Sequence, residues 1–206
     1  DIRQLELSAA HNNMKNTLLL KIDMEQLLYE RNQILKENRE LERRSEIEEF
    51  TNVMNKTAFR THVSAELETM HQDQYVCLLV IDIDKFKSIN DTFGHLVGDQ
   101  VLLHVVKVLK EVLRSSDFIG RIGGDEFCVF MKNILSLPYL YERLDEILDR
   151  LVNTRIEDRQ VLSASIGVCM SNHICRYDEI FQKADEAMYH AKHAGGNCYD
   201  ITELST

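Results

Sequence analysis

The segment VCLLVIDID, residues 76–84, is a continuous apolar run that ends in two acids. An apolar run of this length is typical of a buried β-strand. An unpaired charge is costly to bury, so carboxylates seldom end such a strand without a role. Asp82 and Asp84 are therefore the first candidates for a functional site, and the strand they follow anchors the fold.

The regions around this strand alternate between helical and extended patterns. Strands are expected at 118–121 and 126–131, joined as a hairpin by the tight turn at 123–125, and again at 162–169 and 198–201. Helical spacing covers 98–114, 137–151 and 177–194, with Pro138 in a first turn and Gly195-Gly196 at a helix end. This order predicts an α/β (α+β) fold, a mixed sheet flanked by helices.

The N-terminal region contains neither Gly nor Pro through residue 48, and from about residue 17 it has the pattern of one long helix. Asn38 falls at an inner position of a seven-residue repeat formed by Leu20, Leu27, Ile34 and Leu41. A buried Asn of this kind fixes register and a two-stranded state. We expect residues 1–48 to form a helical stalk, with a parallel dimeric coiled coil from about residue 17, and residues 49–206 to form the main domain. The alternative is a helix packed on its own domain.

Composition narrows the possible partners. The 206 residues carry a net charge of −10, which argues against binding a nucleic acid polymer and suggests that metal ions accompany any phosphate ligand. The apolar runs are too short to span a bilayer, so we expect no membrane contact within this segment. Because the chain starts at Asp1 without Met, we expect a piece of a longer protein, whose upstream part could be membrane-anchored. The five cysteines include no C-x-x-C pair and are expected to be free thiols in a reducing compartment.

A second acidic feature is the turn Gly123-Gly124-Asp125-Glu126. If it lies beside Asp82 at neighbouring strand ends, the carboxylates form the hard-oxygen site that Mg²⁺ prefers. The paired glycines allow a ligand to approach the backbone closely. The alternative is a pair of ordinary turn acids.

Four ordered blocks carry a resemblance to a known family. RIGGDEF at 121–127 resembles the signature of the GGDEF family, the diguanylate cyclases. The block DIDKFKSINDTFGHLVGD at 82–99, SASIGV at 163–168 and ADEAMYHAK at 184–192 resemble further family blocks. The resemblance covers about residues 48–200 and implies a fold like that of nucleotide cyclases and the polymerase palm.

The resemblance also implies an activity. Members of the family condense two GTP molecules into cyclic di-GMP and release pyrophosphate. Two domains face each other, so a homodimer is implied. Each active half-site is expected to use two Mg²⁺ (or Mn²⁺) ions, and the location is expected to be the bacterial cytoplasm.

Residue roles follow from the matching positions. Asp82 and Asp125 match the metal ligands, with the Ile83 carbonyl completing one shell, and Asp125 also matches the acceptor of the 3′-hydroxyl proton. Glu126 is expected to support that cluster. Lys87 matches a lysine that neutralises phosphate charge in the transition state.

The substrate positions are matched in the same way. The residues expected to read guanine are Asn90 and Asp99, and the further nucleotide contacts are His95, Gly123, Gly124 and Lys192. Taken singly, several of these have ordinary explanations: a solvated lysine at Lys87, a turn residue at Asn90, a helix cap at His95. The joint spacing supports the functional interpretation.

Arg114-Ser-Ser-Asp117 matches the family's R-x-x-D product site. Arg suits phosphate or guanine, and Asp suits the guanine edge. The resemblance implies feedback inhibition by cyclic di-GMP at Arg114 and Asp117. The alternative is a solvated helix end with a cap-like Asp.

Two departures from the family pattern affect the functional hypothesis. The block at 48–56 lacks the usual Gly and Arg, and Gly196 stands where the family usually has an Arg that holds terminal phosphates. We therefore expect weakened GTP binding. The leading hypothesis is an active cyclase; the rivals are a catalytically weak or silent domain that acts as a cyclic di-GMP or GTP receptor, and a dimerisation adaptor.

Overall fold

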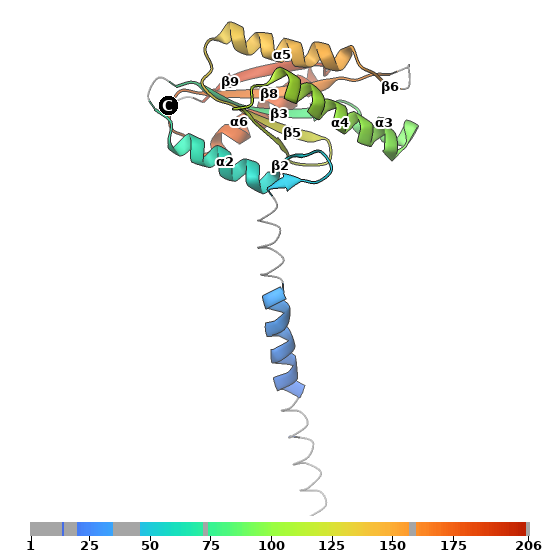
Figure 1. Cartoon of the computed structure of the whole chain (residues 1–206), viewed down its shortest axis with the longest axis vertical. Coiled ribbons are helices and arrows are strands. Elements are labelled where there is room, and N and C mark those ends of the chain that lie inside the picture. Colours follow the sequence, from blue (N-terminus) through green and yellow to red (C-terminus); the bar gives the residue numbers. More distant parts are fainter. Residues whose placement is uncertain (1–13, 15–19, 35–45, 72–73, 157–159, 205–206) are drawn as a thin grey trace, which may run out of the picture. The chain divides into compact units, whose positions relative to one another are not determined.

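The computed structural model describes residues 14, 20–34, 46–71, 74–156 and 160–204 (Figure 1). The chain divides into two compact units, Asp1–Ser45 and Glu46–Thr206. In the first unit residues 20–34 are helical, and the repeat residues Leu20, Leu27 and Ile34 are all exposed. Asn38 and Leu41 lie outside the described residues. The dimeric coiled coil therefore stays a prediction.

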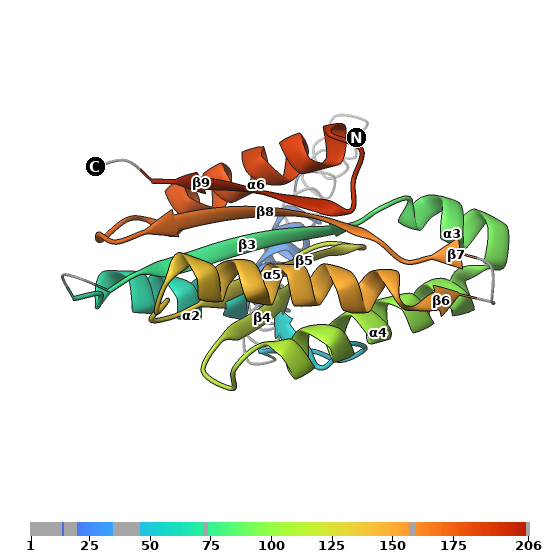
Figure 2. The same ribbon diagram turned by 90° about the horizontal axis from the view of Figure 1, so that it is seen from above.

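The second unit is built on a mixed sheet of seven strands in the order β1-β2-β4-β5-β3-β8-β9 (Figure 2). The central strand β3 pairs antiparallel with β5 and with β8, while β2/β4 and β8/β9 are parallel. The strand bounds are β1 Ile47–Glu48, β2 Val53–Asn55, β3 Val76–Ile83, β4 Phe118–Arg121, β5 Glu126–Met131, β8 Ala164–Ser171 and β9 Cys198–Glu203. A separate ribbon pairs β6 (Arg155–Ile156) with β7 (Gln160–Val161).

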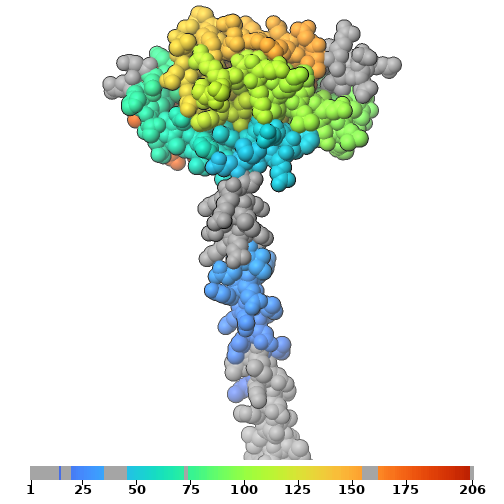
Figure 3. Space-filling model, viewed as in Figure 1, coloured from blue at the N-terminus to red at the C-terminus, as the bar shows by residue number. Residues whose placement is uncertain are grey.

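Helices cover both faces of this sheet. They are α2 (Lys56–Glu68), α3 (Phe86–Phe93), α4 (His95–Val112), α5 (Leu137–Val152) and α6 (Tyr177–His193). Alternate residues of β3 point to opposite faces. Leu79 and Ile81 belong to the core beneath α4 and α5, which lie side by side in Figure 3, and Leu78 and Val80 to the core beneath α2 and α6. The result is a three-layer sandwich. None of the described helices is long and apolar enough to cross a membrane.

The predicted elements are largely confirmed. The central strand and the hairpin have the predicted bounds, and the strand predicted at 198–201 is observed as the edge strand β9, Cys198–Glu203. The helix predicted from residue 98 begins at His95 instead, because Gly94, at φ +85°, separates it from α3. The strand predicted at 162–169 is observed at Ala164–Ser171. The sequence analysis did not assign α2, whose N-cap Asn55 accepts a hydrogen bond from the Ala58 amide at 2.9 Å.

Candidate active site

Asp82, Asp125 and Glu126 form an acidic cluster where β3 and β5 run side by side. Asp82 on β3 is directly opposite Glu126 on β5 and Ser165 on β8. Directly paired residues of neighbouring strands share a face of the sheet, and this is the face covered by α6. The Asp82 side chain is only 7% exposed. The two acidic motifs of the sequence therefore meet, as expected from their positions at strand ends.

The turn at 123–125 is fastened to both neighbouring strands. The Ile122 amide donates to the Glu126 carbonyl at 2.9 Å, and the Ile83 amide donates to the Asp125 carbonyl at 3.3 Å. A Cβ atom at Gly123 would lie 2.8 Å from Oε2 of Glu126, whereas the space around Gly124 is open. Gly123 therefore makes room for the Glu126 carboxylate, and Gly124 leaves a free approach to the turn.

Lys192 reaches the cluster from α6. Its ammonium nitrogen donates to Oδ1 of Asp82 at 2.8 Å. Burial raises the pKa of Asp82, with Asp125 and Asp84 adding to the shift and Lys192 opposing it. Burial also raises the pKa of Glu126, together with the charges of Asp82, Asp125 and Asp185. The cluster thus holds more negative charge than its one close lysine balances.

Asp84 forms a second polar network next to the cluster. Its Oδ1 accepts from the Ser165 hydroxyl at 2.7 Å, and its Oδ2 accepts from the Asn197 amide at 2.9 Å. Gly196 adopts φ +75°, and a Cβ atom there would lie 2.7 Å from Oδ2 of Asp84. At Gly196, where the family pattern has Arg, the Asp84 carboxylate therefore packs against the backbone. This role of Asp84, Ser165 and Asn197 was not predicted, because the contacts join three distant segments of the sequence.

The donor set fits a divalent metal in its chemistry. Carboxylates that are partly buried and repel one another attract a cation, and hard oxygen ligands suit Mg²⁺. The Lys192 ammonium lies at Asp82 where a cation is needed. Within the described part of the chain, however, no three His, Cys, Asp or Glu side chains are grouped as metal ligands.

The predicted guanine reader Asn90 is packed against α4. Its Oδ1 is buried and has no hydrogen-bond partner among the described residues. A Cβ atom at Gly98 would overlap Oδ1 and lie 2.9 Å from Cγ of Asn90. The glycine in this helix therefore leaves the space that the Asn90 amide occupies. The other predicted contacts Lys87, His95 and Asp99 are exposed, and no hydrogen bond or ion pair links them to the described acids of the cluster.

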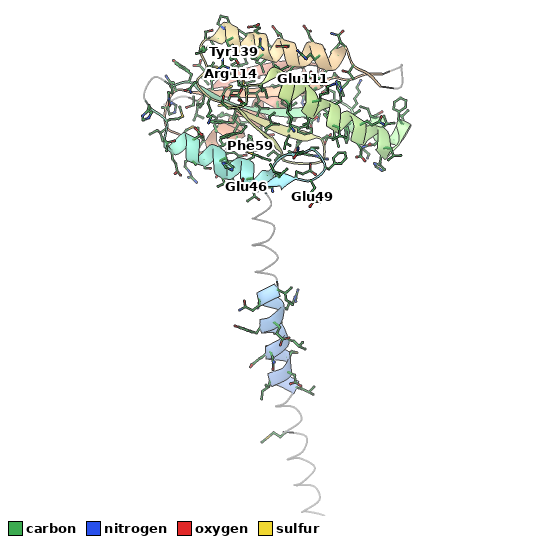
Figure 4. All side chains as sticks on the ribbon, in the orientation of Figure 1. Glu46, Glu49, Phe59, Glu111, Arg114 and Tyr139 are labelled. Carbon is green, nitrogen blue, oxygen red and sulfur yellow. The ribbon has the colours of Figure 1, made fainter. Side chains whose placement is uncertain are left out.

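The predicted product site comes just before β4, at the end of the β4–β5 hairpin opposite the 123–125 turn. Asp117 is 9% exposed, and its carboxylate accepts from the Arg114 amide at 2.9 Å and from the Lys132 amide at 3.4 Å. Burial raises the pKa of Asp117, and these two amides oppose the rise. Asp117 thus closes its own turn. The Arg114 guanidinium instead lies 4.4 Å from the ring centre of Tyr139, beside it in Figure 4.

Arg121 joins the start of the unit to the acidic turn. Its Nε and Nη2 donate to the Gly124 carbonyl at 3.2 and 2.7 Å, and its Nη1 lies 3.4 Å from Oε1 of Glu48. Glu48 also accepts from the amide and hydroxyl of Thr51. Arg121 stands in the RIGGDEF block and Glu48 begins the block at 48–56, but neither was predicted to be a functional residue.

Comparison with known proteins identifies relatives of the second unit. The family model described as "Diguanylate cyclase, GGDEF domain" matches residues 45–198. The chain is 38% identical over 160 residues to "Probable diguanylate cyclase DgcC" and 35% identical over 153 residues to "Probable diguanylate cyclase DgcT", both of Escherichia coli K12. These alignments cover 74% and 72% of the chain but 42% and 34% of the relatives, so the chain spans well under half of their length.

Solved structures agree with the fold. The coiled coil and GGDEF domain of DgcB from Caulobacter crescentus, in complex with c-di-GMP, superposes with a TM-score of 0.70 and 26% identity, covering 90% of this chain and 99% of that one. Diguanylate cyclase SiaD from Pseudomonas aeruginosa, in complex with its activator SiaC, gives a TM-score of 0.68 and 26% identity, covering 98% and 78%. The likeness to DgcB confirms the mixed sheet and its flanking helices.

Proposed function

The chain belongs to the GGDEF family of diguanylate cyclases, and we propose that its second unit condenses two GTP molecules into cyclic di-GMP. In this reaction each 3′-oxygen bonds to the α-phosphorus of the other GTP, the bond to the β-phosphate oxygen breaks, and two pyrophosphates leave. The observation that carries the proposal is the pairing of Asp82 with Glu126 on adjacent strands, with Asp125 in the turn that precedes β5.

The acids would hold Mg²⁺ or Mn²⁺, two ions in each half-site. Asp82, Asp125 and the Ile83 carbonyl are the ligands we assign to them. When bound, the ions would neutralise phosphate charge and favour ionisation of the 3′-hydroxyl. Because the cluster already carries excess negative charge, cations are a physical requirement for a triphosphate to bind there.

The protein side chains have separate roles in this proposal. Asp125 accepts the proton of the 3′-hydroxyl, and Glu126 supports it. Lys192, which donates to Asp82 in this structure, would bind the terminal phosphates, and Lys87 would neutralise charge in the transition state. The remaining contacts read guanine or pack against the nucleotide: Asn90, His95, Asp99, Gly123 and Gly124.

We assign a homodimer to the active state. Each domain supplies one GTP, so two copies must face each other. The helix 20–34 presents Leu20, Leu27 and Ile34 as an exposed repeat, which a second helix would cover. Such a stalk would raise the local concentration of the second domain. Cyclic di-GMP would then inhibit at Arg114 and Asp117; the DgcB structure contains this ligand.

A second candidate function is a receptor that binds cyclic di-GMP or GTP without turnover. Gly196 favours it, because the usual phosphate-binding Arg is absent and the space beside Gly196 is filled by the Asp84 carboxylate. Losing one charge-assisted contact weakens binding by about tenfold or more. That loss reduces affinity but leaves Asp82, Asp125 and Glu126 in place.

The test is synthesis of cyclic di-GMP from GTP with Mg²⁺ or Mn²⁺, followed by chromatography at several protein concentrations. A cyclase limited by dimer formation gives more product per protein as the concentration rises. The matched control is Asp125→Asn, which should lose turnover and keep binding of cyclic di-GMP. If the folded wild-type protein makes no product but binds cyclic di-GMP, the receptor is the correct function.

A further inference from the structure

The ring of Tyr139 contacts two arginines, Arg114 and Arg143. The Arg114 guanidinium carbon lies 4.4 Å from the centre of the Tyr139 ring, and that of Arg143 lies 5.5 Å from it. Both distances are within the range of a cation–π contact, about 6 Å. The ring itself is partly buried and sits in the first turn of α5, where the Tyr139 amide donates to the Ser136 hydroxyl at 3.3 Å.

The two arginines differ in what else they contact. Arg143 is 21% exposed and pairs with Glu142 and Glu146, each at 2.8 Å, so its charge is already balanced. Arg114 is exposed, and its guanidinium forms no ion pair or hydrogen bond with any described residue. Asp117 accepts from the backbone amides of Arg114 and Lys132 and forms no hydrogen bond or close ion pair with the guanidinium, although the Arg114 charge helps to oppose the rise in the pKa of Asp117. Arg143 therefore helps to fix the ring, and Arg114 remains available to a ligand.

We propose that Tyr139 is a positioning residue for the product site: it holds the Arg114 guanidinium over its ring so that a guanine base of cyclic di-GMP can stack on the guanidinium face turned away from the ring. This rests on the product site proposed above. A planar guanidinium can stack on an aromatic face and still donate in its own plane to phosphate or guanine acceptors. An arginine side chain that moves freely in solvent loses conformational entropy when it binds a ligand. An arginine side chain already held on an aromatic ring loses less of that entropy.

The experiment measures binding of cyclic di-GMP to the nucleotide-free 206-residue chain by calorimetry. We expect Tyr139→Leu to weaken binding about three- to tenfold, from the lost cation–π contact and the lost preorganisation. Tyr139→Phe keeps the ring and should bind within about twofold of the wild type. In an Arg114→Ala background, Tyr139→Leu should have no further effect. Thermal unfolding of each variant shows whether the fold is retained.

Each other outcome contradicts the inference. If the folded Tyr139→Leu protein binds cyclic di-GMP as tightly as the wild type, the ring has no role in binding. If Tyr139→Leu weakens binding equally in the Arg114→Ala background, the role of the ring is merely structural. If Arg114→Ala binds like the wild type, or the wild type does not bind, the site itself is wrong. Cyclase activity is assayed separately. A protein that makes no cyclic di-GMP yet binds it through Arg114 and Tyr139 refutes the proposed cyclase alone.

Discussion

The ammonium nitrogen of Lys192 lies 2.8 Å from Oδ1 of Asp82, across 110 positions of sequence. The Asp82 side chain is almost fully buried, whereas the Lys192 side chain is about half exposed. The lysine therefore supplies the positive charge that the buried carboxylate needs while no other cation is present. For Lys192 to bind phosphate, another cation must take its place at Asp82.

Lys192→Met should destabilise the metal-free protein, because it leaves Asp82 buried beside other acids. We expect a loss of about 1–3 kcal/mol in the free energy of unfolding, measured with urea in the presence of a chelator. The double variant Lys192→Met/Asp82→Asn should recover most of that loss. When Mg²⁺ is added in place of the chelator, it should stabilise the Lys192→Met single variant more than the wild type. Equal stability of Lys192→Met and wild type would show that the ion pair has no net effect.

Gly98→Ala should weaken GTP binding, because the added Cβ displaces the Asn90 amide. We expect an increase in KM of about two- to tenfold with little change in kcat, the effect of losing one hydrogen bond in binding. In an Asn90→Ala background the same substitution should add nothing. Gln100→Ala, at an exposed position of the same helix, is the matched control. A larger KM for Gly98→Ala in both backgrounds would mean that the helix, rather than Asn90, is disturbed.

Gly196→Arg should fail to restore a phosphate contact. At φ +75° a residue with a Cβ atom is strained, and the Cβ would press on the Asp84 carboxylate. We expect Gly196→Ala and Gly196→Arg to lose similar stability, about 1–3 kcal/mol, in urea unfolding. Ala194→Arg places the same side chain on an exposed residue at φ −73° and should lose less. Lower KM for GTP in a stable Gly196→Arg protein would contradict this prediction.

His104 should make stability depend on pH. Its Nε2 lies 2.6 Å from the Thr154 hydroxyl, and burial, aided by Lys107, lowers its pKa, while Glu111 opposes the shift. The unfolded chain therefore binds the proton more readily. This contribution to stability is full above the unfolded pKa of about 6.5 and falls as the pH drops through that value toward the folded pKa. Urea midpoints from pH 5 to 8 should decline less at low pH for His104→Gln than for wild type. Parallel curves would contradict this.

The sheet could be predicted where the sequence carries a strong periodic signal. The apolar run at Val76–Ile83 and the glycine turn before Glu126 fix the centre of the sheet. The strands β1 and β2 have two and three residues, too few for alternation to appear. Helix α2 buries only Ala58, Phe59, Val63 and Leu67 along thirteen residues, so its apolar face is narrow.

The candidate site was predictable only in part. The meeting of Asp82 with Glu126 follows from strand ends that come together, and the motif match supplied the residues expected around them. The contacts of Lys192 with Asp82, Gly98 with Asn90 and Tyr139 with Arg114 could not be predicted, because each depends on how the side chains of one helix pack against another element.

Arg121 has a structural consequence. Its Nη1 pairs with Glu48, which lies two residues after the first residue of the second unit. Its Nε and Nη2 donate to the carbonyl of Gly124. One guanidinium therefore contacts both the strand at the start of the second unit and the acidic turn. Removal of the Arg121 side chain would thus take a partner from Glu48 and from the Gly124 carbonyl at the same time.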